Sequence, residues 1–187
     1  MPIMFNTVLA EAGLSLGDVC LLRHQDNQAQ KDRTPYALWR DDRSAFDLFQ
    51  SHQKVGARRK FRRYWASFVG TPDNDTLFVG VYAAKHRGLL EHDTPWPHRD
   101  GVDKAGSCDV YDLTLEKDLE DLIGKLYVEW GRGFIAWVQH ADRQNKLIRE
   151  LRTEFKEPDF PGFLNFVKPL FKTREASAGV DSGFPLL

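Results

Sequence analysis

Two apolar segments joined by a turn constrain the fold of this chain more than any other feature. Tyr64–Val69 (YWASFV) and Leu77–Ala84 (LFVGVYAA) are rich in the aromatic and β-branched residues that favour strands. Between them lies Gly70–Thr76 (GTPDNDT), whose Gly, Pro, Asn and Asp residues are typical of turns. The pattern predicts a β-hairpin around which the rest of the domain is built.

Shorter elements are predicted on both sides of this hairpin. Asp41 and Asp42 offer N-cap oxygens, and Phe46 and Phe49 recur at helical spacing, which predicts a helix over residues 41–54. The other predicted elements are a helix within 5–16, strands at 19–23, 109–113 and 125–130, a helical turn at 116–121, polar loops at 24–35 and 85–107, and a segment at 142–156 that fits either a helix or a strand followed by a helix.

This mixture of elements indicates an α+β fold. Several strands with only two or three short helices favour a curved sheet or a small barrel flanked by those helices. Gly-rich phosphate loops between alternating strands and helices are absent from the sequence, which argues against a doubly wound nucleotide-binding fold. The length of 187 residues predicts one domain, over residues 1–171, and a change of composition predicts a tail or linker at 172–187.

The composition narrows the class of protein. The net charge of −1 gives no global field toward nucleic acid or membrane, so the distribution of charge matters more than its sum. No apolar run approaches the roughly 18 residues that span a bilayer, and residues 1–6 lack the features of a secretory signal. The two cysteines, Cys20 and Cys108, are too few for a disulfide scaffold or a zinc site, so we expect a reduced, cytoplasmic protein. Because no apolar run is long enough to span a bilayer, we expect no membrane partner.

The common catalytic motifs are missing from the sequence. It contains no GxSxG elbow, GxxxxGK[ST] loop, HExxH or CxxC motif. His86, His92 and His98 lie six residues apart in a predicted loop, but no paired ligands or thiolates accompany them, which favours solvated side chains over a metal site. We therefore expect no catalytic residue, no metal site and no cofactor in this chain.

A dense basic run precedes the first strand of the hairpin. Six of the ten residues in 54–63 are basic, and none is acidic. Such side chains bind phosphates without sequence preference and with strong salt dependence. The alternative is a solvated face paired with acids elsewhere, such as 116–121. The predicted phosphate-binding residues are Arg58, Arg59, Lys60, Arg62 and Arg63.

The strand that follows places aromatic and hydroxyl groups together. Trp65 and Ser67 share one face, and Phe68 lies on the other. At the mouth of a small barrel, Trp65 with a nearby donor would form a slot for a planar ring, and Trp39 would supply the opposing wall. Most tryptophans in a domain of this size belong to the core, which is the competing interpretation.

Two glutamines on the predicted helix complete the candidate site. Gln50 and Gln53 lie three residues apart, and therefore on one helical face. Their amides would hydrogen-bond a base edge or a phosphate. The alternative is an ordinary helix surface.

Taken together, these segments resemble the amino-terminal region of a group of bacterial GIY-YIG nuclease proteins. The resemblance covers roughly residues 8–171. Its motifs are the hairpin, FDLFQSHQ at 46–53, GKLYVEW at 124–130, and the segments KLIREL at 146–151 and FKEPDFPGF at 155–163.

The resemblance implies a PUA-like curved β-barrel, related in architecture to EVE, YTH and SRA modules that hold a modified or flipped base in an aromatic pocket. It implies that Trp65, Ser67, Phe68 and Trp39 line this pocket. The chain has no GIY…YIG motif, so the resemblance implies a non-catalytic reader working with a nuclease domain in cis or in trans.

The sequence thus predicts a protein that binds double-stranded DNA and recognises a modified base, a modified cytosine above all, by flipping it into an aromatic pocket. Such a module would direct a modification-dependent restriction nuclease in phage defence. Two other classes stay open: an RNA-binding PUA-like module, and an enzyme or protein-interaction domain whose basic run is paired internally.

Overall fold

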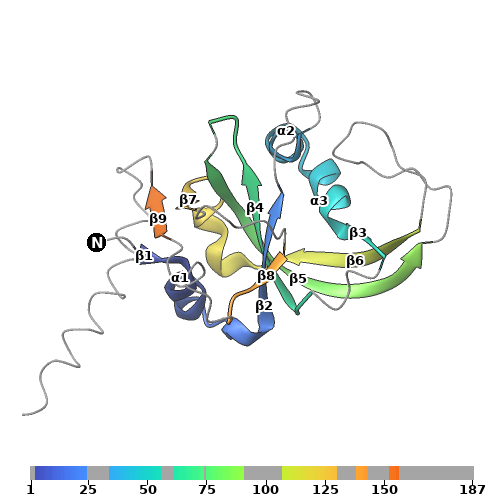
Figure 1. Cartoon of the computed structure of the whole chain (residues 1–187), viewed down its shortest axis with the longest axis horizontal. Coiled ribbons are helices and arrows are strands. Elements are labelled where there is room, and N and C mark those ends of the chain that lie inside the picture. Colours follow the sequence, from blue (N-terminus) through green and yellow to red (C-terminus); the bar gives the residue numbers. More distant parts are fainter. Residues whose placement is uncertain are drawn as a thin grey trace, which may run out of the picture. The chain divides into compact units, whose positions relative to one another are not determined.

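One strongly curled sheet forms a half-barrel (Figure 1). The computed structural model describes residues 3–24, 34–55, 61–73, 75–90, 107–129, 138–142 and 152–155, all within one unit that ends at Lys156. In these ranges the strands are β1 Ile3–Met4, β2 Val19–His24, β3 His52–Lys54, β4 Tyr64–Gly70, β5 Thr76–Leu90, β6 Cys108–Leu115, β7 Leu126–Glu129, β8 Val138–His140 and β9 Arg152–Phe155. The predicted α+β class with a curved sheet is confirmed.

The predicted hairpin, now seen as β4 and β5, forms the centre of the sheet. The strand order is β1-β9-β7-β5-β4-β2-β8, and β6 pairs with β5 and with β3. β4 is antiparallel to β5, with Trp65 opposite Tyr82, and parallel to β2, with Cys20 opposite Trp65. Because β4 has a neighbouring strand on each side, the inward side chains of β4 lie between those of β2 and β5.

Two irregularities bend β5. The register of β5 against β4 shifts near Gly80, where Val79 has no opposite residue on β4. Its register against β6 shifts near Gly88, where Arg87 has no opposite residue on β6. Both glycines have positive φ, +138° at Gly80 and +156° at Gly88. β-bulges increase local twist and curvature, so these two positions help to curl the sheet.

The long loop predicted at 85–107 is wrong over residues 85–90. There β5 continues and pairs with β6, from Lys85 opposite Asp112 to Leu90 opposite Cys108. The sequence of residues 85–90 lacks the apolar alternation that predicts a strand. Backbone pairing with β6 does not depend on apolar side chains, so the strand forms without that pattern. Residues 91–106 lie outside the described residues.

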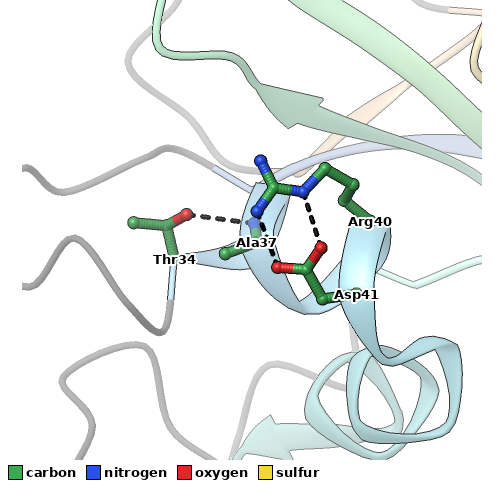
Figure 2. A network of polar contacts seen from close by, with 4 residues as sticks. All are labelled: Thr34, Ala37, Arg40 and Asp41. Atoms are coloured by element: carbon green, nitrogen blue, oxygen red, sulfur yellow. Dashed lines mark hydrogen bonds and ion pairs between the residues drawn. The ribbon is translucent and has the colours of Figure 1, made fainter.

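Three α-helices accompany the sheet in the described ranges: α1 Phe5–Glu11, α2 Pro35–Asp41 and α3 Arg43–Ser51. Thr34 is the N-cap of α2, and its Oγ1 accepts a hydrogen bond from the Ala37 amide at 3.1 Å (Figure 2). Near the end of α2, Arg40 forms an ion pair with Asp41 at 2.6 Å. Asp42 is the N-cap of α3, and its Oδ1 accepts a hydrogen bond from the Ala45 amide at 3.0 Å. The starts of α2 and α3 thus each have the side-chain acceptor that free N–H groups require, whereas α1 has no side-chain cap.

The helix predicted over 41–54 is shorter than expected at both ends. Asp41 closes α2, and the residues of β3 pair with β6 instead of continuing the helix, with His52 opposite Val110. The other predicted helix, strands and helical turn correspond to α1, β2, β6, β7 and the 3-10 helix η3 Lys117–Leu122; a second 3-10 helix, η1, spans Leu16–Asp18. Of the loop predicted at 24–35, His24 belongs to β2 and Pro35 to α2, and residues 25–33 lie outside the described residues. Within the undecided segment 142–156, residues 152–155 form β9, and residues 143–151 and 156 lie outside the described residues.

None of the helices in the described part of the chain is long and apolar enough to cross a membrane.

Gly80→Ala tests whether the first bulge needs a glycine. A Cβ at Gly80 would lie 2.8 Å from Leu115 Cδ1, whereas one at Gly88 would meet nothing within 4 Å. Since both positions have positive φ, we expect Gly80→Ala to lower the free energy of unfolding by about 1–3 kcal/mol more than Gly88→Ala. Urea denaturation of both variants measures this difference, and equal losses of stability would contradict the role of the close packing.

Candidate functional site

Trp65 lies at the centre of an aromatic cluster and is fully buried, with 0% of its surface exposed. The ring of Phe61 stacks on it, with centroids 4.6 Å apart and planes at 29°, and Tyr111 lies 4.8 Å away. Its indole Nε1 donates a hydrogen bond to the Arg62 carbonyl at 3.1 Å. The open slot expected at Trp65 is therefore closed in this structure, because Phe61, Tyr111, Cys20 and Leu22 pack around the indole.

Trp39 does not face Trp65. It packs in a separate cluster with Phe46, Val69, Leu77 and Val79. The guanidinium of Arg43 lies 4.2 Å from the centroid of its ring. The opposing wall expected from Trp39 is thus absent from the cluster around Trp65, where Phe61 and Tyr111 take that position.

Phe68 packs in a third cluster. Its ring lies 5.0 Å from that of Phe5 and 5.7 Å from that of Phe78, and all three are fully buried. The alternation of β4 directs Phe68 away from Trp65 and Ser67. It supports the sheet from the other face and does not line the same site as Trp65.

The structure does bring Gln50 and Ser67 together, although they are 17 positions apart along the chain. Ser67 Oγ donates to Gln50 Oε1 at 3.0 Å, and both side chains are fully buried. Gln50 Nε2 donates to Asp47 Oδ1 at 3.2 Å. Gln53 Nε2 donates to the Gln50 carbonyl at 2.6 Å, so that side chain holds the end of α3.

Tyr82 and Asp47 extend this polar network. Burial, and next the nearby Asp47 carboxylate, raise the pKa of the Tyr82 phenol. Burial also raises the pKa of Asp47, against hydrogen bonds from Gln50 and Tyr82 that lower it. Because Tyr82 is the cross-strand neighbour of Trp65, the polar network directly adjoins the aromatic cluster.

His24 contributes a buried imidazole. Its ring lies 5.6 Å from that of Phe46 and 5.1 Å from that of Phe49. Burial lowers its pKa to about 4, and a hydrogen bond with Gln50 opposes this effect. His24 is therefore neutral at physiological pH.

Sequence reasoning missed Asp47, Tyr82 and His24. Asp47 precedes Gln50 by three residues, and the helical spacing alone would have placed the two together. Tyr82 and His24 come from strands whose register the sequence does not reveal. Perturbed titratable groups gathered at one place are typical of functional sites, and also of structural networks.

Exposed cations flank the aromatic cluster. Arg62 and Arg63 immediately precede β4 and are both exposed. Arg62 Nη2 lies 3.3 Å from His140 Nδ1, and the Arg63 guanidinium lies 5.0 Å from the centroid of the Tyr64 ring. Within the described ranges no ion pair joins either arginine to an acid. Arg58, Arg59 and Lys60 lie outside the described residues.

The histidines and cysteines that the sequence singled out form no metal centre within the described ranges. His86 Nε2 lies 2.9 Å from Asp109 Oδ1, and the part of the chain that the structure describes holds no group of three His, Cys, Asp or Glu side chains suited to a metal ion. His92 and His98 are outside that part. Burial raises the pKa of Cys20 to about 12, so this thiol is protonated at neutral pH.

Comparison with known proteins finds no matching family model, no matching curated protein and no matching solved structure. The resemblance to GIY-YIG nuclease proteins stays a prediction from the sequence motifs.

The pKa of His24 predicts acid sensitivity of the fold. An unfolded histidine titrates near 6.5, so the unfolded state binds more protons than the folded state between pH 6.5 and 4. The free energy of unfolding should fall as the pH falls through this window, by about 2 kcal/mol from His24 at pH 5. Protonation of Asp47 acts in the opposite direction, because its pKa is raised in the folded state.

His24→Gln provides the control. Urea denaturation at pH 7 and pH 5 should show a smaller fall in the variant than in the unaltered protein. Equal falls would mean that other groups cause the acid sensitivity.

Proposed function

We propose that this protein is a non-catalytic reader of double-stranded DNA that holds one flipped, modified base, a modified cytosine above all, beside Trp65. One observation carries the proposal. Over six residues, from Arg62 to Ser67, the chain places two exposed guanidinium groups next to Trp65 of the buried aromatic cluster and Ser67 of the buried hydrogen-bonding network.

The exposed cations suit the DNA backbone. Arg62 and Arg63 make no ion pair with an acid among the described residues, so their charge is available to phosphates. Contacts of this kind supply affinity without sequence preference. Specificity then has to come from another part of the site.

The aromatic cluster and the polar network together suit a base. Taking a nucleotide out of the stack costs a few kcal/mol, and stacking on an aromatic side chain returns roughly 1–3 kcal/mol. Ser67 and Tyr82 place hydroxyl groups beside Trp65, and Asp47 adds a partly exposed carboxylate. To discriminate between bases, these groups would exchange their present hydrogen bonds for bonds to the base, and a base that cannot form the new bonds would leave them without partners.

The partner we propose is a nuclease domain of the GIY-YIG type, in cis or in trans. This part of the proposal rests on the motifs of the hairpin and the segments around it. The reader would select modified DNA, and the nuclease would cut it.

Replacement of Arg62 and Arg63 by alanine tests the contribution of the cations. Fluorescence anisotropy would use duplexes identical except for one position, which carries cytosine, 5-methylcytosine, 5-hydroxymethylcytosine, glucosylated cytosine or, in place of the cytosine, N6-methyladenine. The double variant should weaken binding to all duplexes by a similar factor. It should also make the slope of log affinity against log salt concentration less steep, by about 0.9 for each phosphate that the variant no longer neutralises.

Arg40→Ala is the matched control for this double variant, since Arg40 is exposed but paired with Asp41. It should leave both the affinity and the salt dependence as they are in the unaltered protein. Binding that is unchanged in the double variant would contradict the proposed role of Arg62 and Arg63.

Trp65→Phe tests the base-binding role on the same duplexes. We expect the preference for the modified duplex to fall about fivefold, since a smaller ring stacks less well, while binding to the unmodified duplex changes little. Phe78→Leu, which replaces an equally buried aromatic of a different cluster, should keep the preference. Thermal unfolding of both variants checks that they are folded at the assay temperature.

Three results would overturn the proposal. An equal decrease in affinity for modified and unmodified duplexes in Trp65→Phe would remove the base-binding role. Stronger competition by single-stranded RNA would favour an RNA-binding module. The absence of binding to any nucleic acid at low salt would favour an enzyme or a protein-interaction domain.

A further inference from the structure

We infer that Phe61 occupies the place of the flipped base and has to leave Trp65 before the base can bind. The inference rests on the proposed function and deepens it, because it identifies the surface of Trp65 on which the base stacks and the residue that controls access to it.

The geometry of the Phe61 ring is that of a stacked ligand. Its plane is 29° from that of Trp65 at a centroid distance of 4.6 Å, and its edge meets Tyr111 at 5.3 Å. Offset stacking of this kind is the arrangement that aromatic rings, bases included, prefer on an indole. A base that replaced Phe61 would find one stacking surface and one edge contact already in position.

The position of Tyr111 is itself supported. Its ring packs against that of His86 at 5.1 Å, and the His86 side chain is held by Asp109 at 2.9 Å. Trp65 is fixed by its hydrogen bond to the Arg62 carbonyl. The two rings that would receive a base are thus held by contacts that do not involve Phe61.

Phe61 is the outermost ring of the cluster. It is only partly buried, whereas Trp65 is 0% and Tyr111 5% exposed. Its backbone lies outside β4, which begins at Tyr64. Phe61 is therefore the ring of this cluster that leaves at the lowest cost.

Its neighbours connect this movement to the DNA backbone. Arg62 follows Phe61 directly and is exposed. A phosphate bound by the Arg62 side chain would therefore lie one residue away from the ring that has to leave. We expect the release of Phe61 to accompany the engagement of phosphates.

Substitutions at Phe61 test the inference. If the base displaces the Phe61 ring, a smaller side chain should strengthen binding, whereas if the ring stays as a wall of the site, a smaller side chain should weaken it. Phe61→Ala should bind the 5-methylcytosine and 5-hydroxymethylcytosine duplexes about threefold to tenfold more tightly, since no stacked ring has to be displaced. Phe61→Leu should lie between Phe61→Ala and the unaltered protein, and the larger ring in Phe61→Trp should weaken binding. A duplex with an abasic site, which offers no ring to stack, should bind equally to all four proteins.

Phe49→Ala is the matched control, since Phe49 is also partly buried but belongs to the cluster around Trp39. It should leave the affinity for every duplex unchanged. Thermal unfolding shows whether each variant is folded, and the series from tryptophan to alanine keeps the test valid if Phe61→Ala alone is unstable.

The outcomes separate this inference from the proposed function. If the unaltered protein prefers a modified duplex and Phe61→Ala binds it equally or less tightly, Phe61 is a permanent wall and only the inference fails. If neither the unaltered protein nor Phe61→Ala distinguishes the modified duplexes from the unmodified one, the proposed function fails as well. Tighter binding of the abasic duplex by Phe61→Ala would show a general effect on DNA affinity and would also overturn the inference.

Discussion

Gln50 and Ser67 are polar side chains in the interior, and their hydrogen bond constrains how the elements around them pack. An amide and a hydroxyl group that are fully removed from water cost free energy unless they are hydrogen-bonded. The two satisfy one another at 3.0 Å, and Asp47 accepts a further hydrogen bond from the Gln50 amide. This requirement fixes α3 over β4 in one register, because a shift of either element would leave both groups without partners.

The hydrogen bond between Ser67 and Gln50 also separates two aromatic clusters, one around Trp65 and one around Trp39. The cluster of Trp65, Tyr111 and Phe61 lies beside Cys20 and Leu22, and that of Trp39 lies around Phe46 and Val69. Ser67 lies between Trp65 and Val69 along β4, so polar groups stand between the two clusters. Apolar packing alone would permit several arrangements, and buried polar groups reduce their number.

Much of the architecture could be predicted from local patterns. The β4–β5 hairpin, the presence of α3 and the separation of Trp65 and Phe68 onto opposite faces follow from residue type and period. The continuation of β5 through residues 85–90 could not be predicted, because its support is the backbone of β6 and its sequence is polar. The site is less predictable than the fold. The contact of Phe61 with Trp65 depends on the path of the chain before β4, and Trp39 lies away from Trp65 because α2 directs it into another cluster.

The pairing of β1 with β9 has a consequence for biosynthesis. Ile3 lies opposite Thr153, so the first strand meets its neighbour only after about 150 further residues have been added. Until β9 leaves the ribosome, β7 lacks its neighbour on that side and exposes an unpaired edge. Contacts so distant in sequence slow folding, and a nascent chain of this protein therefore passes through a stage in which it is open to edge-to-edge association and to capture by chaperones.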